Sequence, residues 1–313
     1  MDLVLQFALL ALGFVLLGKG ADWFVEGAAG IAAKFGIPQL VIGLTIVAMG
    51  TSAPEAAVSI AASPKGSADI TIGNVVGSNI MNVLLILGLT AVVCVIPVQK
   101  STVRYEIPFT CLITLILVGM GAFDHQISRA EGLILWGLML IYLAYLLRMT
   151  KKGNAGQEEE NHKKEPWWKL ILMMIVGVAF IKFGSDFTVD SASELARMMK
   201  MSDRLIGLTI IAFGTSLPEL VTSVTAARKG KTDIAVGNIV GSNIFNILFV
   251  VGTAALIIPV EYTANFVIDG LVAVATMVLL WLCVIRDHSI KKTEGAILLI
   301  AYLGYFAYLI MQG

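Results

Sequence analysis

Apolar segments long enough to cross a lipid bilayer recur along the whole chain, and short polar breaks separate them. A membrane-spanning helix needs roughly 20 predominantly apolar residues. Runs of this kind predict ten helices, near residues 3–29, 39–62, 70–96, 105–122, 130–147, 168–193, 205–227, 234–258, 264–285 and 294–311. No basic segment precedes the first run and no small-residue cleavage site follows it, so we expect it to be retained as a helix. The pattern predicts an all-α membrane protein with ten transmembrane helices.

One polar break is longer than the others and lies near the middle of the chain. Residues 149–166 are rich in Lys and Glu, which is typical of a polar linker. The segment is too short to fold as a domain of its own. We therefore expect a first five-helix repeat at residues 1–148 and a second five-helix repeat at 167–313.

The two halves are related in sequence. Residues 41–84 and 205–248 align without a gap at an offset of 164, and 26 of the 44 positions are identical. Two motifs occur in both copies, namely Gly-Thr-Ser-x-Pro-Glu at 50–55 and 214–219, and Gly-Asn-x-x-Gly-Ser-Asn-Ile-x-Asn at 73–82 and 237–246. Because each half holds an odd number of predicted spans, the second half must enter the membrane from the opposite side. We therefore expect the repeats to be inverted.

The distribution of Lys and Arg predicts the orientation, because these residues accumulate in cytoplasmic loops. Placing the N-terminus outside puts 15 basic residues in cytoplasmic loops and five in outer loops and termini. We therefore expect a multi-pass protein of the plasma membrane with both termini outside and the linker, residues 149–166, in the cytoplasm.

Composition excludes several classes of protein. The chain is 58% hydrophobic and 14% charged, with a mean hydropathy of +0.87, whereas a soluble protein is about a quarter charged. This excludes a soluble enzyme and a nucleic-acid-binding protein. The 22 basic residues equal the 22 acidic residues in number, so the net charge favours no partner. The three cysteines lie in apolar runs and are expected to be small core residues.

Glu55 and Glu219 are the most informative positions. Both lie well inside apolar runs, where a carboxylate costs roughly 2.5 to 3.5 kcal/mol to insert, so an intramembrane acid is a functional candidate. The alternative is an acid paired with a Lys or Arg of another helix. The only basic residues within the predicted helix bodies are Lys19 and Lys182, and each has its own acid at helical spacing. We therefore interpret both glutamates as functional.

The neighbours of the two glutamates indicate a cation. Pro54 and Pro218 break the helices directly before them, and a broken helix in a bilayer is tolerated only inside the protein or beside a cavity. The carbonyls and hydroxyls freed near each break supply oxygen ligands, from Ala48, Thr51, Ser52, Ala212, Thr215 and Ser216. Hard cations such as Ca²⁺ prefer oxygen, whereas zinc or copper would require His or Cys. All three histidines lie in predicted loops.

The second motif adds further oxygens. Ser78 and Asn82 lie on one helix face because they are four residues apart, as do Ser242 and Asn246, and we favour ligation for these four. Four more amides are equally consistent with ligation and with hydrogen bonds between helices, at Asn74, Asn79, Asn238 and Asn243. Four acids near helix ends are expected to reach the membrane interface, with the mouth of an ion pathway as the alternative; they are Asp22, Glu26, Asp186 and Asp190.

The paired motifs resemble the two alpha repeats of the cation/calcium antiporter superfamily, specifically its prokaryotic sodium/calcium exchanger branch, and the resemblance covers essentially the whole chain. It implies exchange of Ca²⁺ for Na⁺ by alternating access at a midplane site, with no cofactor. Carried over residue by residue, it implies cation ligands at Ala48, Thr51, Ser52, Glu55, Ser78, Asn82, Ala212, Thr215, Ser216, Glu219, Ser242 and Asn246. Some relatives carry Asp at one of the positions held here by Asn82 and Asn246.

Two other transport functions remain open at this point. An H⁺/Ca²⁺ antiporter would use the same carboxylates as proton acceptors, and a cation channel would pass Ca²⁺ without a counter-ion. An intramembrane hydrolase is disfavoured because no predicted helix body holds a histidine. The expected partners are Ca²⁺, Na⁺ and the lipid bilayer, without nucleic acid, and we expect the monomer to function alone.

Overall fold

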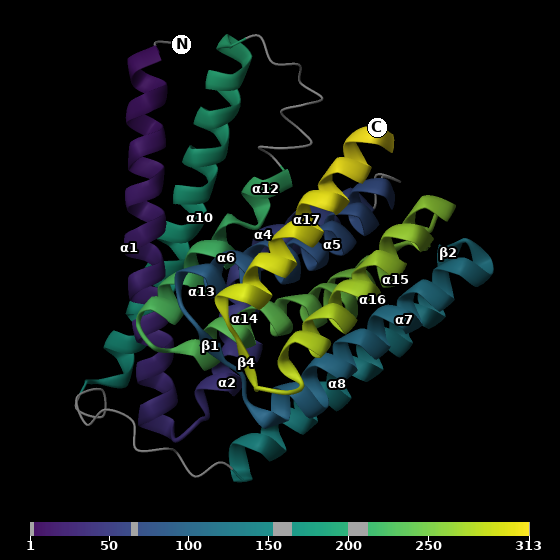
Figure 1. The fold of residues 1–313 in the computed structure, drawn as a ribbon, viewed down its shortest axis with the longest axis horizontal. Helices are drawn as coiled ribbons and strands as arrows, with labels where there is room; N and C mark the ends of the chain where they lie inside the picture. Colours follow the sequence, from purple (N-terminus) through teal and green to yellow (C-terminus); the bar gives the residue numbers. More distant parts are fainter. Residues whose placement is uncertain (1–2, 64–67, 153–164, 200–211, 313) are drawn as a thin grey trace.

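The computed structural model describes residues 3–63, 68–152, 165–199 and 212–312, and nearly all of them are helical (Figure 1). The first half contains α1 (Leu3–Phe35), α2 (Gln39–Ile42), η1 (Gly43–Val47), α3 (Ala48–Thr51), α4 (Ala53–Ala62), α5 (Ala68–Met81), η3 (Asn82–Leu87), α6 (Gly88–Val93), β1 (Ile96–Pro97), η4 (Thr102–Glu106), α7 (Ile107–Asp124), β2 (Gln126–Ile127) and α8 (Arg129–Lys152). The second half contains α10 (Trp167–Met198), α12 (Ala212–Thr215), α13 (Leu217–Arg228), α14 (Thr232–Phe245), η6 (Asn246–Val251), α15 (Gly252–Ile257), β3 (Val260–Glu261), α16 (Ala264–Val284), β4 (Ser289–Ile290) and α17 (Lys292–Gln312).

The observed helices agree with the apolar runs. Eight helices of the described residues are long and apolar enough to span a membrane, and the bent pair 39–51 and 53–60 brings the number to nine. The seventh predicted helix, near 205–227, lies partly outside the described residues. The predicted end of the first helix at residue 29 is wrong, because α1 continues to Phe35. Residues 27–33 of α1 are all buried, so packing against the protein extends this helix beyond the predicted end.

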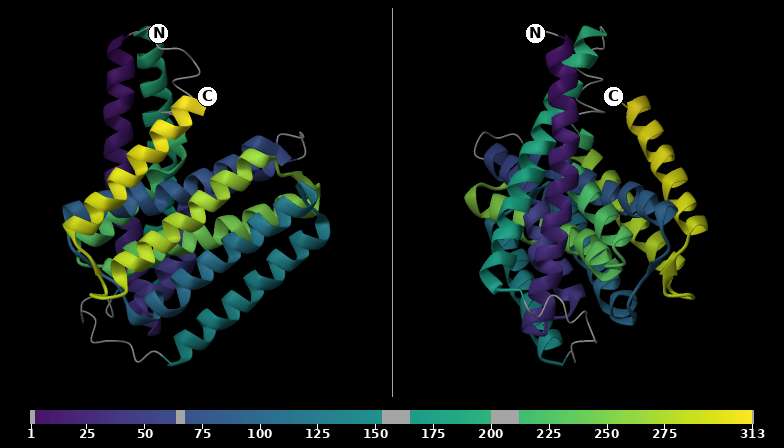
Figure 2. Two further views of the ribbon diagram at one scale, coloured as in Figure 1. Left: turned by 45° about the vertical axis from the view of Figure 1, so that its right-hand side comes forward. Right: turned by 90° about the vertical axis from the view of Figure 1, so that its left-hand side faces the viewer.

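Helices α1 and α10 form a pair that stands apart in direction from the other helices (Figure 2). Glycines allow their backbones to touch. A Cβ added at Gly13 would lie 2.9 Å from the carbonyl oxygen of Gly184, and a Cβ at Gly20 would lie 2.8 Å from that of Gly177. The repeat offset of 164 relates Gly13 to Gly177 and Gly20 to Gly184. The same contact therefore occurs twice, related by the repeat, as expected for two copies that pack in opposite directions.

The helix α14 lies at the centre of the molecule, and almost all of its residues are buried. Its glycines allow close contact with the first repeat. A Cβ at Gly237 would lie 2.9 Å from Cα of Gly43, and a Cβ at Gly241 would lie 2.7 Å from Cα of Leu44. These two glycines therefore let α14 pack directly against the backbone of the first repeat.

Two short antiparallel ladders link the halves at the ends of helices, and the sequence analysis did not predict them. Strand β1 pairs with β4, with Ile96 opposite Ile290, and β2 pairs with β3, with Ile127 opposite Val260. His125 and His288 precede β2 and β4 with φ of 55° and 49°. These left-handed residues turn the chain sharply from a helix into a strand.

Within the described ranges four segments are π-helical, and none was predicted: η1, η3, η4 and η6. Two of them begin at equivalent residues of the repeat, Asn82 and Asn246. A π-helical turn inserts one extra residue into an α-helix and often occurs at a functional site. Here the extra residue changes the direction in which the side chains after the second motif point.

We predict that Gly241→Ala lowers the thermal unfolding midpoint of the purified protein. The new methyl group would meet backbone atoms 2.7 Å away, and overpacking of this kind costs about 1 to 3 kcal/mol. Gly137→Ala is the control, because a Cβ at that helical position meets no atom within 4 Å, so the midpoint should stay unchanged or rise. Equal midpoints for the two variants would contradict this account of the α14 contact.

Candidate cation site

Both halves contain a broken helix at the same position of the repeat. In the first half α3 ends at Thr51 and α4 begins at Ala53, and the helix axis bends there by 50°. In the second half α12 ends at Thr215 and α13 begins at Leu217. A proline occupies the start of the helix after each break, where its missing N–H leaves no helical hydrogen bond unmade. The predicted interruptions of the two helices are confirmed.

The two glutamates lie in the first turn after these breaks, and both are 1% exposed. Ser52 donates a hydrogen bond from Oγ to Oε1 of Glu219 at 2.7 Å, so a residue of the first break contacts the acid of the second. Ser216 is the equivalent neighbour of Glu55, so each acid lies beside the serine of the opposite break. Within the described residues, neither glutamate forms an ion pair with Lys or Arg.

Four amides join the two copies of the second motif. Asn79 donates from Nδ2 to the carbonyl oxygen of Asn243 at 3.2 Å, and Asn243 donates to the carbonyl oxygen of Asn79 at 3.1 Å. Asn82 donates to Oδ1 of Asn243 at 3.0 Å, and Asn246 donates to Oδ1 of Asn79 at 3.1 Å. Each bond has its repeat-related counterpart. Asn79 and Asn243 therefore hold the helices together, which was one of the two predicted alternatives.

Two further amides brace the broken helices. Asn74 donates to Oγ of Ser59, and Asn238 donates to Oγ of Ser223, both at 2.9 Å. Each also reaches the carbonyl oxygen of the glutamate in its own repeat, at 3.3 and 3.4 Å. Thr51 donates from Oγ1 to Oδ1 of Asn238 at 2.9 Å and so connects the halves. Hydrogen bonding between helices therefore accounts for these amides as well.

Four buried acceptors at repeat-related positions receive no hydrogen bond within the described structure: Oε2 of Glu55, Oε2 of Glu219, Oδ1 of Asn82 and Oδ1 of Asn246. Buried polar atoms are nearly always paired, so a group of unpaired acceptors indicates a ligand. The described part of the chain holds no group of three or more His, Cys, Asp and Glu side chains that would bind a metal. Two carboxylates with neutral oxygens suit a hard cation that must also be released.

The family model described as sodium/calcium exchanger protein matches residues 5–148 and 169–311, which is most of the chain. The chain belongs to this family. The recognition of the family from the paired motifs is confirmed.

Known exchangers are similar to this protein over nearly their whole length. The sodium/calcium exchanger MaX1 from Methanosarcina acetivorans is 32% identical, and the match covers 98% of this chain and 99% of MaX1. A solved structure of the sodium-calcium exchanger NCX_Mj has a TM-score of 0.85 and 31% identity, covering 98% of this chain and all of that chain. The Ca(2+)/H(+) antiporter ChaA from Bacillus subtilis is 26% identical, covering 85% of this chain and 83% of ChaA. This exchanger is therefore a membrane transporter of the antiporter type and not an enzyme.

The remaining predicted ligands lie at different places in the exchanger. Ser242 donates from Oγ to the carbonyl oxygen of Ala48 at 3.5 Å, and Oγ1 of Thr51 lies 3.3 Å from the same oxygen. These three residues therefore come together beside the break in the first repeat. Thr215 is half-buried and ends α12, and Ala212 begins that helix.

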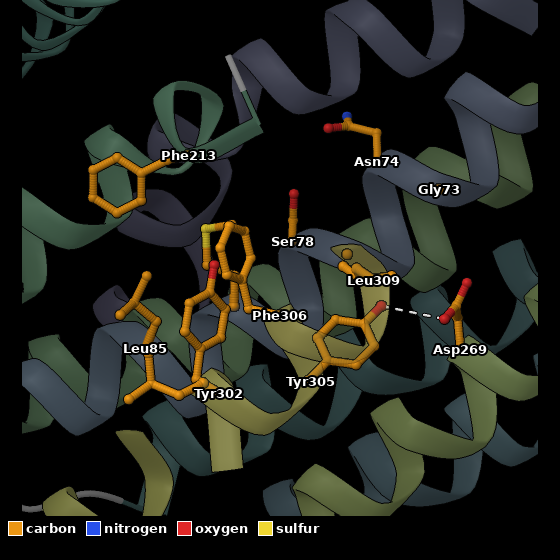
Figure 3. Close-up of a pocket in the computed structure, with 13 residues that line it drawn as sticks. Gly73, Asn74, Ser78, Leu85, Phe213, Asp269, Tyr302, Tyr305, Phe306 and Leu309 are labelled. Atoms are coloured by element: carbon orange, nitrogen blue, oxygen red, sulfur yellow. Dashed lines mark hydrogen bonds between the residues drawn. The ribbon is translucent and has the colours of Figure 1, made fainter. Parts of the chain in front are cut away.

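Ser78 lies on the wall of a cavity of about 480 Å³ on the outer side of α5. Figure 3 shows Ser78 and Asn74 with Phe213 and Tyr302 around this cavity. Because Asn74 also contacts the backbone of Glu55, the cavity adjoins the carboxylate site. Across the cavity, Tyr305 donates a hydrogen bond to Oδ1 of Asp269 at 3.3 Å.

Three of the four acids near helix ends, Asp22, Glu26 and Asp186, have basic partners. Lys182 pairs with Asp186 at 2.5 Å, as the helical spacing predicts. The pairing expected for Asp22 within its own helix is wrong, because its partner is Lys229, at 3.0 Å, which also binds Glu26 at 2.8 Å. This lysine follows α13, so the contact joins the two halves and depends on the tertiary structure.

The sequence analysis overlooked one buried carboxylate. Glu106 is 1% exposed and accepts a hydrogen bond from the hydroxyl of Tyr145. It lies near the edge of an apolar run and two residues from Arg104, so it resembles an acid at the interface. Only the structure shows that Glu106 is buried and that no Lys or Arg of the described residues forms an ion pair with it.

We predict that Asn79→Ala and Asn243→Ala each lower the free energy of unfolding by about 1 to 3 kcal/mol, because each leaves buried polar groups unpaired. Asn79 donates to the backbone of Asn243 and Asn243 donates to the backbone of Asn79, so each substitution removes hydrogen bonds of its own. Unfolding in mixed detergent micelles measures both values. Either variant as stable as the wild-type protein would contradict the hydrogen bonding between the two copies of the motif.

Proposed function

We propose that this exchanger transports Ca²⁺ in one direction and Na⁺ in the other through a single site between the two repeats. The observation that supports this is the group of four unpaired acceptors, two carboxylates and two amides, at repeat-related buried positions. Two ionised carboxylates without a basic partner carry a charge that one Ca²⁺ balances. Na⁺ has a similar radius and also accepts oxygen ligands, so the two ions compete for the same site.

The proposed ligand set is the one implied by the sequence. Glu55, Glu219, Asn82 and Asn246 supply the central oxygens because their acceptors are unpaired. The surrounding oxygens come from Ala48, Thr51, Ser52, Ser78, Ala212, Thr215, Ser216 and Ser242. Ca²⁺ takes six to eight oxygens at flexible geometry, and this set offers enough of them.

The proposed architecture is ten helices in two inverted repeats, residues 1–148 and 167–313, which contain the motifs 41–84 and 205–248. The paired glycine contacts of α1 with α10, and the paired amide contacts of the second motif, support opposite orientations of the copies. We place both termini outside the plasma membrane and the linker 149–166 in the cytoplasm, with the monomer as the functional unit.

Transport proceeds by alternating access. The broken helices and the second motif form a fixed site, and α1 with α10 moves across it to open one side at a time. The direct glycine contacts between these two helices favour their movement as one body. Exchange of one Ca²⁺ for more than two Na⁺ leaves the loaded site positive, so that turnover responds to the membrane potential.

We predict that Glu55→Gln and Glu219→Gln each strongly reduce Na⁺-driven Ca²⁺ uptake into proteoliposomes at low Ca²⁺. Each substitution keeps the shape of the side chain and removes one ligand charge, and a contact of this kind contributes about 1.5 to 3 kcal/mol, so the affinity for Ca²⁺ should fall about ten- to a hundredfold. Glu261→Gln is the control, because this acid lies exposed in β3. Unchanged uptake in both glutamine variants at low Ca²⁺ would refute the site.

The similarity to ChaA makes H⁺ the second candidate counter-ion. We expect an outward Na⁺ gradient to drive Ca²⁺ uptake with no pH gradient present, with the membrane potential clamped in both arms. A pH gradient alone should drive none. Uptake driven by the pH gradient in Na⁺-free medium would instead establish H⁺/Ca²⁺ exchange.

A further inference from the structure

A third buried carboxylate, Glu106 in η4, lies outside the proposed transport site. Its side chain is 1% exposed, and the hydroxyl of Tyr145 donates a hydrogen bond to Oε1. The other oxygen, Oε2, is buried and accepts no hydrogen bond. Among the described residues no Lys or Arg forms an ion pair with it. Buried polar atoms are nearly always paired, so the unpaired oxygen of Glu106 indicates that a bound ligand donates a hydrogen bond to it.

Aromatic rings surround this carboxylate. Phe109 stacks on Tyr142 with ring centroids 5.6 Å apart, and Tyr142 lies 6.4 Å from Tyr145. Together with Glu106, these rings line a cavity of about 360 Å³ between α7 and α8. The hydroxyl of Tyr142 is also buried without a partner. Aromatic faces beside a carboxylate are the usual surroundings of a bound ammonium group.

The cavity opens toward the lipid bilayer near its surface. Its rim includes Leu112 and Ile141, which are 53% and 64% exposed and so face lipid in a membrane. Glu106 follows the start of its span, Thr102, by four residues, which corresponds to about 6 Å of helix. This depth lies close to the phospholipid headgroups.

A basic group stands beside the acid on the same rim. Arg104 is exposed and lies over the ring of Tyr105, 5.6 Å from its centroid. A guanidinium at this depth reaches the phosphate of a lipid, which it binds through two hydrogen bonds. The cavity therefore presents a carboxylate, aromatic faces and a cation to one ligand.

We propose that this cavity binds a phospholipid with a primary amine, such as phosphatidylethanolamine. The ammonium group donates to Oε2 of Glu106 and contacts the rings of Tyr142 and Tyr145, while the phosphate binds Arg104. The acyl chains follow the apolar rim formed by Leu112 and Ile141. This site is separate from the proposed transport site and does not depend on the identity of the counter-ion.

The chemistry distinguishes the amine from other headgroups. The trimethylammonium group of phosphatidylcholine contacts aromatic rings but has no N–H to donate to the carboxylate oxygen. Phosphatidylglycerol donates hydroxyl hydrogen bonds but carries no positive charge to balance the acid. Only a primary ammonium among these headgroups supplies both the charge and the donor.

Native mass spectrometry of the full-length exchanger, titrated with phosphatidylethanolamine, phosphatidylcholine and phosphatidylglycerol of identical acyl chains, tests the proposal. We expect one molecule of phosphatidylethanolamine to bind about tenfold more tightly than either of the others, which corresponds to one charge-assisted hydrogen bond. Glu106→Gln should remove this preference, and Glu261→Gln, the change at an exposed acid, should keep it.

A second variant avoids the risk that Glu106→Gln fails to fold. Arg104→Gln changes an exposed residue. It should lower the affinity for all three phospholipids by a similar factor, because each of them carries the phosphate that Arg104 binds. Equal affinities of the wild-type protein for the three lipids would overturn the proposal. A preference that survives Glu106→Gln would overturn it as well, since the amine would then bind elsewhere.

Discussion

Glu55 and Glu219 are buried close together in the interior of the protein, where the dielectric constant is low. Within the described structure no basic side chain neutralises them. Such an arrangement is costly to keep, and the surroundings of Glu55 and Glu219 reduce the cost. The helix breaks before both residues bring hydroxyl and carbonyl groups close, and amides of the neighbouring helices hold the broken segments in place. In the function proposed above, a transported cation completes the balance of charge, and burial of the two acids then links the architecture to the transport.

Duplication explains why several contacts between the halves occur twice. In a duplicated chain, a hydrogen bond from the first copy to the second can have a counterpart in the reverse direction. The amides of Asn79 and Asn243 follow this rule closely, as do those of Asn82 and Asn246. The glycines of α1 and α10 repeat the same relation in the packing of two backbones.

The sequence was sufficient to predict the family, the apolar helices, the broken segments and the two glutamates, because hydropathy and repetition are local properties of the chain. It left the role of four amides open, since the hydrogen-bond partners of such a side chain depend on how helices distant in sequence pack; they are Asn74, Asn79, Asn238 and Asn243. The π-helical turns were missed because one extra residue hardly changes an apolar run. Glu106 was missed for a different reason: an acid at the edge of a run resembles an interfacial one until its burial is known.

The two acids that share Lys229 lie one helical turn apart on α1, with Asp22 before Glu26. Because Lys229 contacts both acids at once, it fixes this end of α1 against the residue that follows α13 through two ion pairs that cross between the halves. Any movement of α1 relative to α13 therefore has to break or replace both ion pairs together.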